Sequence, residues 1–217
     1  MIPQISLFFG SDEVIEPFLS ERLKKAKEMK IDIFPHILPR KYIEAVNRIS
    51  GDLYYNKQVN QAIPTIYDLD IRFRVLDKYG DMLQVLTLGA PPIEAIAEPK
   101  QAVELARIAN DGMAELVLKY PDRFVSAVAS LPMNDIDAAL KEADRAINDL
   151  KFRGVQIYTP TNGKPIDLPE FLPLYEKMAE YNLPIWIHPV RERTTPDYVG
   201  ESSSKYFIWG IFGWPYE

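Results

Sequence analysis

The sequence predicts an α/β fold, a (β/α)8 barrel that is incomplete and contains about five to six βα units. Short apolar segments alternate with amphipathic helical segments, as is typical of parallel strands joined by right-handed helical crossovers. The predicted strands lie near residues 30, 83, 124, 154 and 184. A full barrel needs eight strands and roughly 250 residues. We therefore expect part of the barrel to be absent from these 217 residues.

Start and stop signals mark the helices between these strands. Helices are predicted over residues 67–79, 99–118, 134–150 and 167–181. Gly80 is a stop signal after the first, and Pro99 suits the first turn of the second. Asp167 is expected to cap the last helix, because Glu170 follows three positions later in a capping-box-like arrangement.

Three further segments are less regular. The polar segment 40–66 is predicted to be a long loop or short helices. The aromatic segment 206–214 looks like the start of a sixth unit, and it is more typical of a helix core or an interface than of a ligand platform. Residues 1–28 are predicted to form an N-terminal helical extension. Residues 29–217 would then be the barrel domain, truncated at its C-terminus.

The composition excludes several classes of function. The net charge is -6 and no run of Lys or Arg is long enough to suggest nucleic acid, so a nucleic-acid partner is not expected. No apolar segment approaches the roughly 20 residues that span a bilayer, and no membrane partner is expected. The chain has no cysteine, which rules out disulfides, thiolate metal sites and a Cys nucleophile. Without a basic leader at the N-terminus, we expect a cytoplasmic protein.

The two histidines each close an apolar segment. His36 and His188 would stand at the C-terminal ends of two strands, where barrel enzymes build their active sites. We predict that both bind a metal ion, with ordinary structural histidines as the alternative. Strand alternation would place Asp32, Phe34 and His36 on one face. Catalytic zinc usually takes three protein ligands, so the third would come from Asp32, Glu217 or a missing segment.

Two arginines follow His188 closely. Arg191 and Arg193 are candidates to clamp a substrate carboxylate, and a solvated loop is the alternative. Arg40 and Lys41, after His36, carry the same two interpretations. The sequence contains no Gly-rich phosphate loop, P-loop lysine motif or Gly-x-Ser-x-Gly elbow.

Several segments resemble, in the same order, the amidohydrolase-related family that includes aminocarboxymuconate-semialdehyde decarboxylase and γ-resorcylate decarboxylase. The similar segments are 29–36, 72–80, 123–124 with 127–132, 154–157, 186–189 and 212–217. The resemblance implies a metal-dependent TIM barrel whose members are mostly nonoxidative decarboxylases, with some hydrolases. It covers essentially everything from Met29 onward.

The resemblance also implies roles for individual residues. The first strand of the family usually supplies two ligands, as His-x-His or Glu-x-His. His36 matches the second of these and His188 matches the histidine of strand five. Phe34 stands where the first ligand is expected, and a phenyl ring cannot bind a metal. The family's later catalytic histidine and strand-eight aspartate would lie beyond Glu217.

We therefore expect a metal-dependent nonoxidative decarboxylase, a carboxy-lyase, of a small unsaturated or aromatic carboxylic acid, incomplete as this chain. The expected cofactor is a divalent metal, Zn or Mn, on His36 and His188, with Arg191 and Phe34 binding the substrate. The catalytic acid or base is not assigned. The expected assembly is a homo-oligomer, a dimer. The alternatives are a hydrolase of the same superfamily and a metal-free pseudoenzyme or binding subunit.

Overall fold

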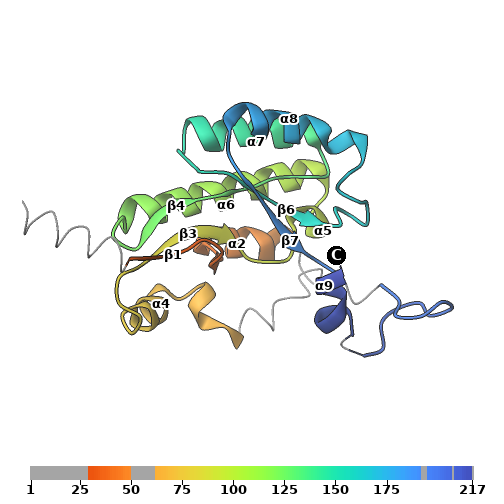
Figure 1. Cartoon of the computed structure of the whole chain (residues 1–217), viewed down its shortest axis with the longest axis horizontal. Helices are drawn as coiled ribbons and strands as arrows, with labels where there is room; N and C mark the ends of the chain where they lie inside the picture. The colour runs from red at the N-terminus through yellow and green to blue at the C-terminus, as the bar shows by residue number, and fades with distance from the viewer. Residues whose placement is uncertain (1–28, 50–61, 192–194, 207, 217) are drawn as a thin grey trace, which may run out of the picture.

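The computed structural model describes residues 29–49, 62–191, 195–206 and 208–216. Strands and helices alternate along most of this chain (Figure 1). In chain order the elements are β1 (Lys30–Asp32), β2 (His36–Ile37), α2 (Arg40–Ile49), η2 (Pro64–Ile66), α4 (Leu69–Leu76), β3 (Met82–Leu88), α5 (Ile93–Ile96), α6 (Pro99–Lys119), β4 (Phe124–Ala127), β5 (Ala129–Ser130), α7 (Ile136–Asn148), β6 (Val155–Thr159), η3 (Pro169–Phe171), α8 (Leu172–Tyr181), β7 (Ile185–Pro189), η4 (Trp209–Gly213) and α9 (Trp214–Tyr216).

The strands are parallel, and neighbours in the sheet follow one another along the chain. β1 and β2 both pair with β3, β3 pairs with β4, β5 pairs with β6, and β6 pairs with β7. Val128, the residue between β4 and β5, also bonds to β3, because its N–H donates to Leu86 O at 3.0 Å. The five predicted strands are thus confirmed, with the first and third each interrupted once.

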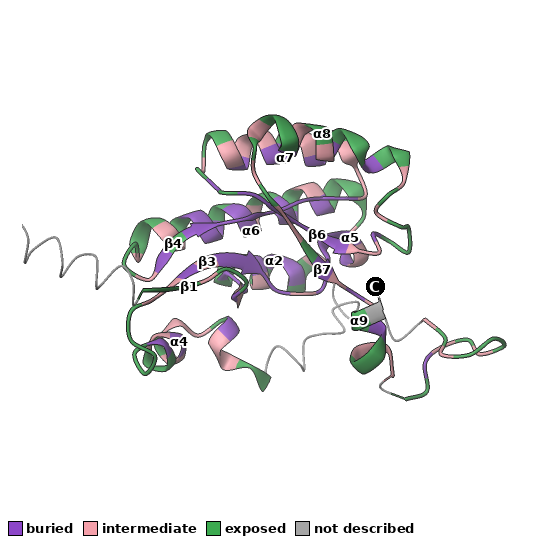
Figure 2. Cartoon of the chain, viewed as in Figure 1, coloured by how far each residue is buried: buried purple, intermediate pink, exposed green. Residues whose placement is uncertain are grey.

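The core lies between these strands and the helices that cover them. In Figure 1, α6, α7 and α8 run side by side along one side of the strands, and α6 contacts α7 as α7 contacts α8. The buried residues are concentrated on the strands and on the sides of the helices that face them (Figure 2). Leu86, Leu105, Met113 and Phe124 are essentially inaccessible to solvent. Full burial of each such side chain stabilises the fold by about 1.5–3 kcal/mol.

One buried amide ties two helices to the sheet. Asn110 of α6 donates to Ser130 O at 3.0 Å and to a Glu142 carboxylate oxygen of α7 at 2.7 Å. Its own side-chain oxygen accepts from Ser130 N–H at 2.9 Å. Because unpaired polar groups are costly in a protein interior, these three bonds fix where β5 ends relative to α6 and α7.

The predicted helices exist, with one start misplaced. Asp68 and Asp135 cap α4 and α7 by accepting from the N–H groups of Ile71 and Ala138. The predicted cap at Asp167 is wrong, because α8 begins only at Leu172, after the short helix η3. The reason is Pro173, which fits only in the first turn of a helix and so sets where α8 starts.

The segment after His36 is more regular than expected. Residues 40–49 form the helix α2, whose buried residues are Tyr42, Ala45 and Val46, and α2 packs on α6. Arg40 pairs with Glu44, and Lys41 with Glu115, all at exposed positions. These pairs match the solvated alternative for the two cations. Residues 50–61 of the predicted loop lie outside the described residues.

The described residues of the aromatic C-terminal segment form helical structure in η4 and α9, and no sixth strand occurs among them. Ile211 and Phe212 in it are exposed. The predicted extension over residues 1–28 lies outside the described residues, so that boundary stays a prediction. None of the helices in the described part of the chain is long and apolar enough to cross a membrane.

Candidate metal centre

The first strand contains an extra residue that reverses the direction of its side chains. In β1, Asp32 pairs with Gln84, whereas in β2, His36 pairs with Thr87. The sequence separation of paired residues falls from 52 to 51 between these two pairs, as at a β-bulge. Since Gln84 and Thr87 lie on opposite faces of the continuous strand β3, Asp32 and His36 also lie on opposite faces. The prediction that Asp32 and His36 lie on one face of the strand is therefore wrong.

The bulge nevertheless leaves Phe34 beside His36. The Phe34 N–H donates to Asp32 Oδ1 at 3.2 Å, within the bend that separates β1 from β2. The Phe34 ring centroid lies 5.2 Å from that of His36 and 5.7 Å from that of His188. Phe34 is 37% exposed, so it borders the histidines on an accessible side.

His36 and His188 come together from β2 and β7. Their Nε2 atoms are 3.2 Å apart. The hydroxyl of Thr87 donates to Pro35 O at 3.0 Å, which leaves its oxygen to accept from His36 Nδ1–H at 2.8 Å. His188 Nδ1–H donates to Pro189 O at 2.7 Å. With both Nδ1 atoms acting as donors, the two neutral rings turn Nε2 lone pairs toward each other.

The surroundings disfavour the charged form of both rings. Burial, followed by the charges of His188 and Arg72, lowers the pKa of His36 to about 4, against an opposing effect of Asp32. Burial also lowers the pKa of His188. Two lone pairs at this distance repel unless a cation lies between them. The 3.2 Å separation is close to what two imidazole ligands, each roughly 2.0–2.1 Å from one zinc ion, require.

The described part of the chain places no third ligand of this kind beside the pair. Within the described residues, no group of three or more His, Cys, Asp or Glu side chains could hold a metal ion. Asp32 instead accepts from Gln84 Nε2 at 3.1 Å on the opposite face. Asp32 as third ligand is therefore not supported, and Glu217 lies outside the described residues.

Aromatic side chains surround His188. Tyr158 lies opposite His188 in the β6–β7 register, with ring centroids 4.8 Å apart. Trp214 approaches edge-on at 6.1 Å. Neither Tyr158 nor Trp214 was predicted from the sequence as a residue of this site. Tyr158 could have been found, because it closes the predicted strand near 154 just as His188 closes the next one.

Arg191 follows three residues after His188. A Cβ atom added to Gly213 would collide with the Arg191 side chain, so Arg191 packs directly against the backbone of η4. Whether this arginine contacts a substrate stays a prediction. Arg193 lies outside the described residues.

Comparison with known proteins identifies the family. Residues 9–213 match the family model described as Amidohydrolase. This chain belongs to the amidohydrolase family. A gamma-resorcylate decarboxylase of Rhizobium radiobacter is 34% identical over 162 residues, which are 70% of this chain and 47% of that protein. A 2-amino-3-carboxymuconate-6-semialdehyde decarboxylase of Dictyostelium discoideum is 29% identical over 178 residues, 75% of this chain and 49% of the other.

A solved structure carries the same fold. The dihydroxybenzoic acid decarboxylase of Polaromonas sp., with bound manganese and the inhibitor 2-nitroresorcinol, matches with a TM-score of 0.61 and 30% identity, covering 76% of this chain and 50% of that one. The predicted family and the predicted incomplete barrel are thereby confirmed. This amidohydrolase chain spans about half the length of the curated relatives it matches.

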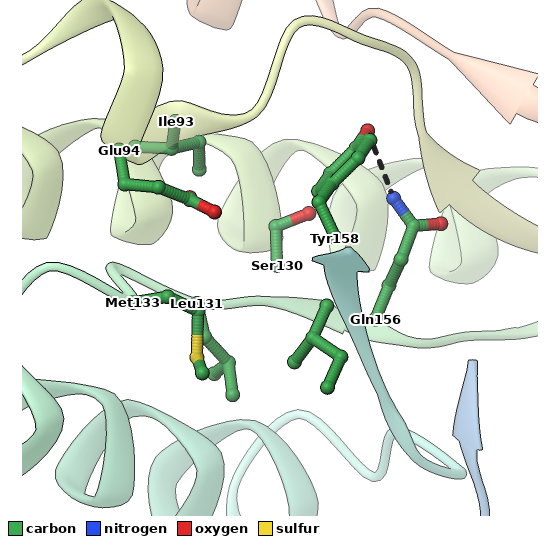
Figure 3. Close-up of a pocket in the computed structure, with 8 residues that line it drawn as sticks. Ile93, Glu94, Ser130, Leu131, Met133, Gln156 and Tyr158 are labelled. Atoms are coloured by element: carbon green, nitrogen blue, oxygen red, sulfur yellow. Dashed lines mark hydrogen bonds between the residues drawn. The ribbon is translucent and has the colours of Figure 1, made fainter. Parts of the chain in front are cut away.

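A buried acid of this amidohydrolase lines a small space together with Tyr158, the neighbour of His188 (Figure 3). Glu94 of α5 lines a small enclosed space together with Ser130, Gln156 and Tyr158. Glu94 Oε1, Ser130 Oγ and Gln156 Oε1 have no hydrogen-bond partner among the described residues. Burial raises the pKa of Glu94 to about 7, against a hydrogen bond from its own backbone. Glu94 was not predicted as a site residue, although a single glutamate within the apolar segment 91–97 is a signal of a buried acid.

Proposed function

We propose that this amidohydrolase serves metal-dependent, nonoxidative decarboxylation of a small aromatic or unsaturated carboxylic acid. His36 and His188 would bind the divalent metal, manganese or zinc. The observation that carries the proposal is the pair of facing Nε2 atoms, 3.2 Å apart, with both Nδ1 atoms already engaged. The decarboxylase names of the relatives and the manganese in the Polaromonas enzyme support it.

The chain's own residues prepare the site. Thr87 and the Pro189 carbonyl hold the two imidazoles in the tautomer that leaves Nε2 free, a role that commonly strengthens metal binding. Phe34 and Tyr158 place flat apolar surfaces beside His188. Such surfaces favour an aromatic ring and exclude water. Arg191 is proposed to pair with the substrate carboxylate.

A divalent cation, when bound, supplies Lewis-acid stabilisation of the negative charge that develops on the substrate. In the overall reaction the bond between the carboxylate carbon and the ring or alkene carbon breaks. Carbon dioxide leaves, and the remaining carbon takes one proton. At least one further ligand, and the proton donor, are proposed to come from outside the described residues, because catalytic sites of this kind usually use three protein ligands.

One observation favours a second candidate function. Phe34 lies beside both histidines and cannot bind a metal, and the described residues provide no third ligand. A metal-free relative that binds an aromatic carboxylate would have the same features. The relatives named above are decarboxylases, so they favour a decarboxylase over a hydrolase for this chain.

The test begins with the metal content of the full chain across its size-exclusion peak, after incubation with manganese or zinc. Near-stoichiometric metal in the chain, lost in His36→Ala and His188→Ala, is the expected result. γ-Resorcylate is then supplied, and carbon dioxide and resorcinol are measured. Metal binding without turnover would support a metal site but not the decarboxylase. A monodisperse, metal-free chain that binds the acid would support the second candidate. The same column tests the predicted dimer, and a cytoplasmic location remains part of the proposal.

A further inference from the structure

A cavity of about 330 Å³ lies between α4, η2 and the first strand. Much of its wall is apolar, made by Ile63, Ile66, Val75 and Leu76. The polar residues that line it are Arg72, Gln84, Thr65 and His36. The volume is at the lower end of the roughly 300–1,000 Å³ typical of small-molecule sites. The cavity is therefore suited to one small ligand with a large apolar part.

Only some of the N–H groups of the Arg72 side chain form hydrogen bonds among the described residues. Arg72 is 5% exposed. Its Nε donates to Gln84 Oε1 at 2.8 Å, and its Nη1 donates to His36 O at 2.8 Å and Thr65 O at 3.0 Å. These bonds use three of the five N–H groups of a guanidinium. The two N–H groups on Nη2 form no hydrogen bond within the part of the chain that the structure describes.

Within the part of the chain that the structure describes, the charge of Arg72 also has no direct counter-ion. Among the described residues, it forms no ion pair with a carboxylate. Asp32 is connected only through Gln84, and its two oxygens already accept from Gln84 Nε2 and the Phe34 N–H. Burial lowers the pKa of Arg72 to about 10, with an opposing effect of Asp32. A buried cation without a paired anion is costly, so an anion at Nη2 would stabilise it.

We propose that this cavity binds a small monocarboxylate with an apolar body. Its carboxylate would accept from Nη2 of Arg72, and its body would lie against Ile63, Ile66, Val75 and Leu76. Inorganic phosphate fits less well, because it would leave this apolar wall without a partner. The inference does not depend on the proposed decarboxylase activity. His36 also lines this cavity, and its carbonyl accepts a hydrogen bond from Arg72 Nη1.

The test uses the full chain, freed of metal by dialysis against a chelator and then against buffer. Benzoate and benzamide are titrated separately by calorimetry, because they share size and shape but differ in charge. Benzoate is expected to bind about tenfold or more tightly than benzamide, as the charge-assisted hydrogen bonds require. Val75→Phe, which fills the cavity, should abolish benzoate binding. Leu118→Phe, which adds the same ring at an exposed position of α6, should leave it unchanged.

Equal binding of benzoate and benzamide would overturn the proposal, as would unchanged benzoate affinity in Val75→Phe. If Val75→Phe does not fold, Ile63→Trp at the exposed edge of the cavity takes its place. A second measurement follows the Nε–Hε resonance of Arg72 by nitrogen-15 NMR. The chemical shift of this resonance should change when benzoate is added and stay the same with benzamide. An unchanged chemical shift with benzoate would also contradict the proposal.

Discussion

Asp32 and His36, four residues apart in one predicted strand, lie on opposite faces of the sheet. One extra residue between β1 and β2 causes this, since Asp32 pairs with Gln84 and His36 with Thr87. As a result His36 meets His188 on one face, while Asp32 joins Gln84 and Arg72 on the other. Regular strand alternation would place Asp32 and His36 side by side, but the bulge gives them separate partners.

The Thr87 hydroxyl is expected to strengthen metal binding by fixing the His36 tautomer. Thr87→Val keeps the shape but removes the acceptor of His36 Nδ1–H. Loss of such a partner typically weakens metal affinity by about 10–100-fold. Calorimetric titration with zinc measures this effect. Ser126→Ala, a buried hydroxyl of β4 that does not contact either histidine, is the matched control, and an equal loss in both variants would exclude a specific role of Thr87.

Phe34→His is expected to raise metal affinity. The Phe34 ring already lies within 5.7 Å of both imidazole centroids, so a histidine there can add a third nitrogen ligand. Zinc affinity of Phe34→His is compared with that of Phe34→Leu, which removes the ring without adding a ligand. Equal affinities in the two variants would mean that position 34 does not reach the metal.

Glu94 is expected to make the chain less stable as the pH rises. Its pKa is about 7 in the folded protein, whereas an ordinary glutamate, as in the unfolded chain, has a pKa of 4.5. Between these values the folded state binds more protons at Glu94 than the unfolded state, so the contribution of Glu94 to stability falls as the pH rises from about 4.5 to about 7 and changes no further above that range. The difference of about 2.5 units corresponds to about 3 kcal/mol at most.

Urea unfolding of the wild type and of Glu94→Gln at pH 5 and pH 8 measures this dependence. Glu94→Gln keeps a neutral side chain of similar shape at both pH values. It should be more stable than the wild type at pH 8, with little difference at pH 5. Parallel pH dependences of the two proteins would show that Glu94 does not titrate in this range.

Asn110 is expected to be a strong contributor to stability. Asn110→Leu removes three buried hydrogen bonds and leaves the Ser130 backbone groups unpaired. We expect a loss of about 2–4 kcal/mol in the free energy of unfolding, measured in urea. Asn148→Leu, at an exposed position of α7, is the control and should change stability by less than about 0.5 kcal/mol.

The sequence was enough to predict the five strands and the two histidines at strand ends. Apolar segments with clear boundaries, such as 82–88 and 183–188, carry that information locally. The bulge before His36 was not predictable, because it depends on the register with β3. Its physical cause lies in the pairing of Thr87 with His36, 51 positions away. The helix α2 was underestimated because its exposed surface is strongly polar.

The site was predictable only in part for a similar reason. His36 and His188 are conspicuous because they are the only histidines. Tyr158 and Trp214 contact His188, and Glu94 lines a space beside Tyr158, through contacts between separate βα units. Their residue types are also common in ordinary cores. Only the assembled sheet distinguishes them from structural residues.

The most direct test of the central claim counts the imidazole ligands of the bound metal. Electron spin echo envelope modulation of the manganese-loaded chain reports the nitrogen nuclei coordinated to the ion. Our account predicts two imidazole nitrogens in the wild type, and one in either His36→Ala or His188→Ala. A bound ion without imidazole nitrogen, or a spectrum unchanged in both variants, would contradict it.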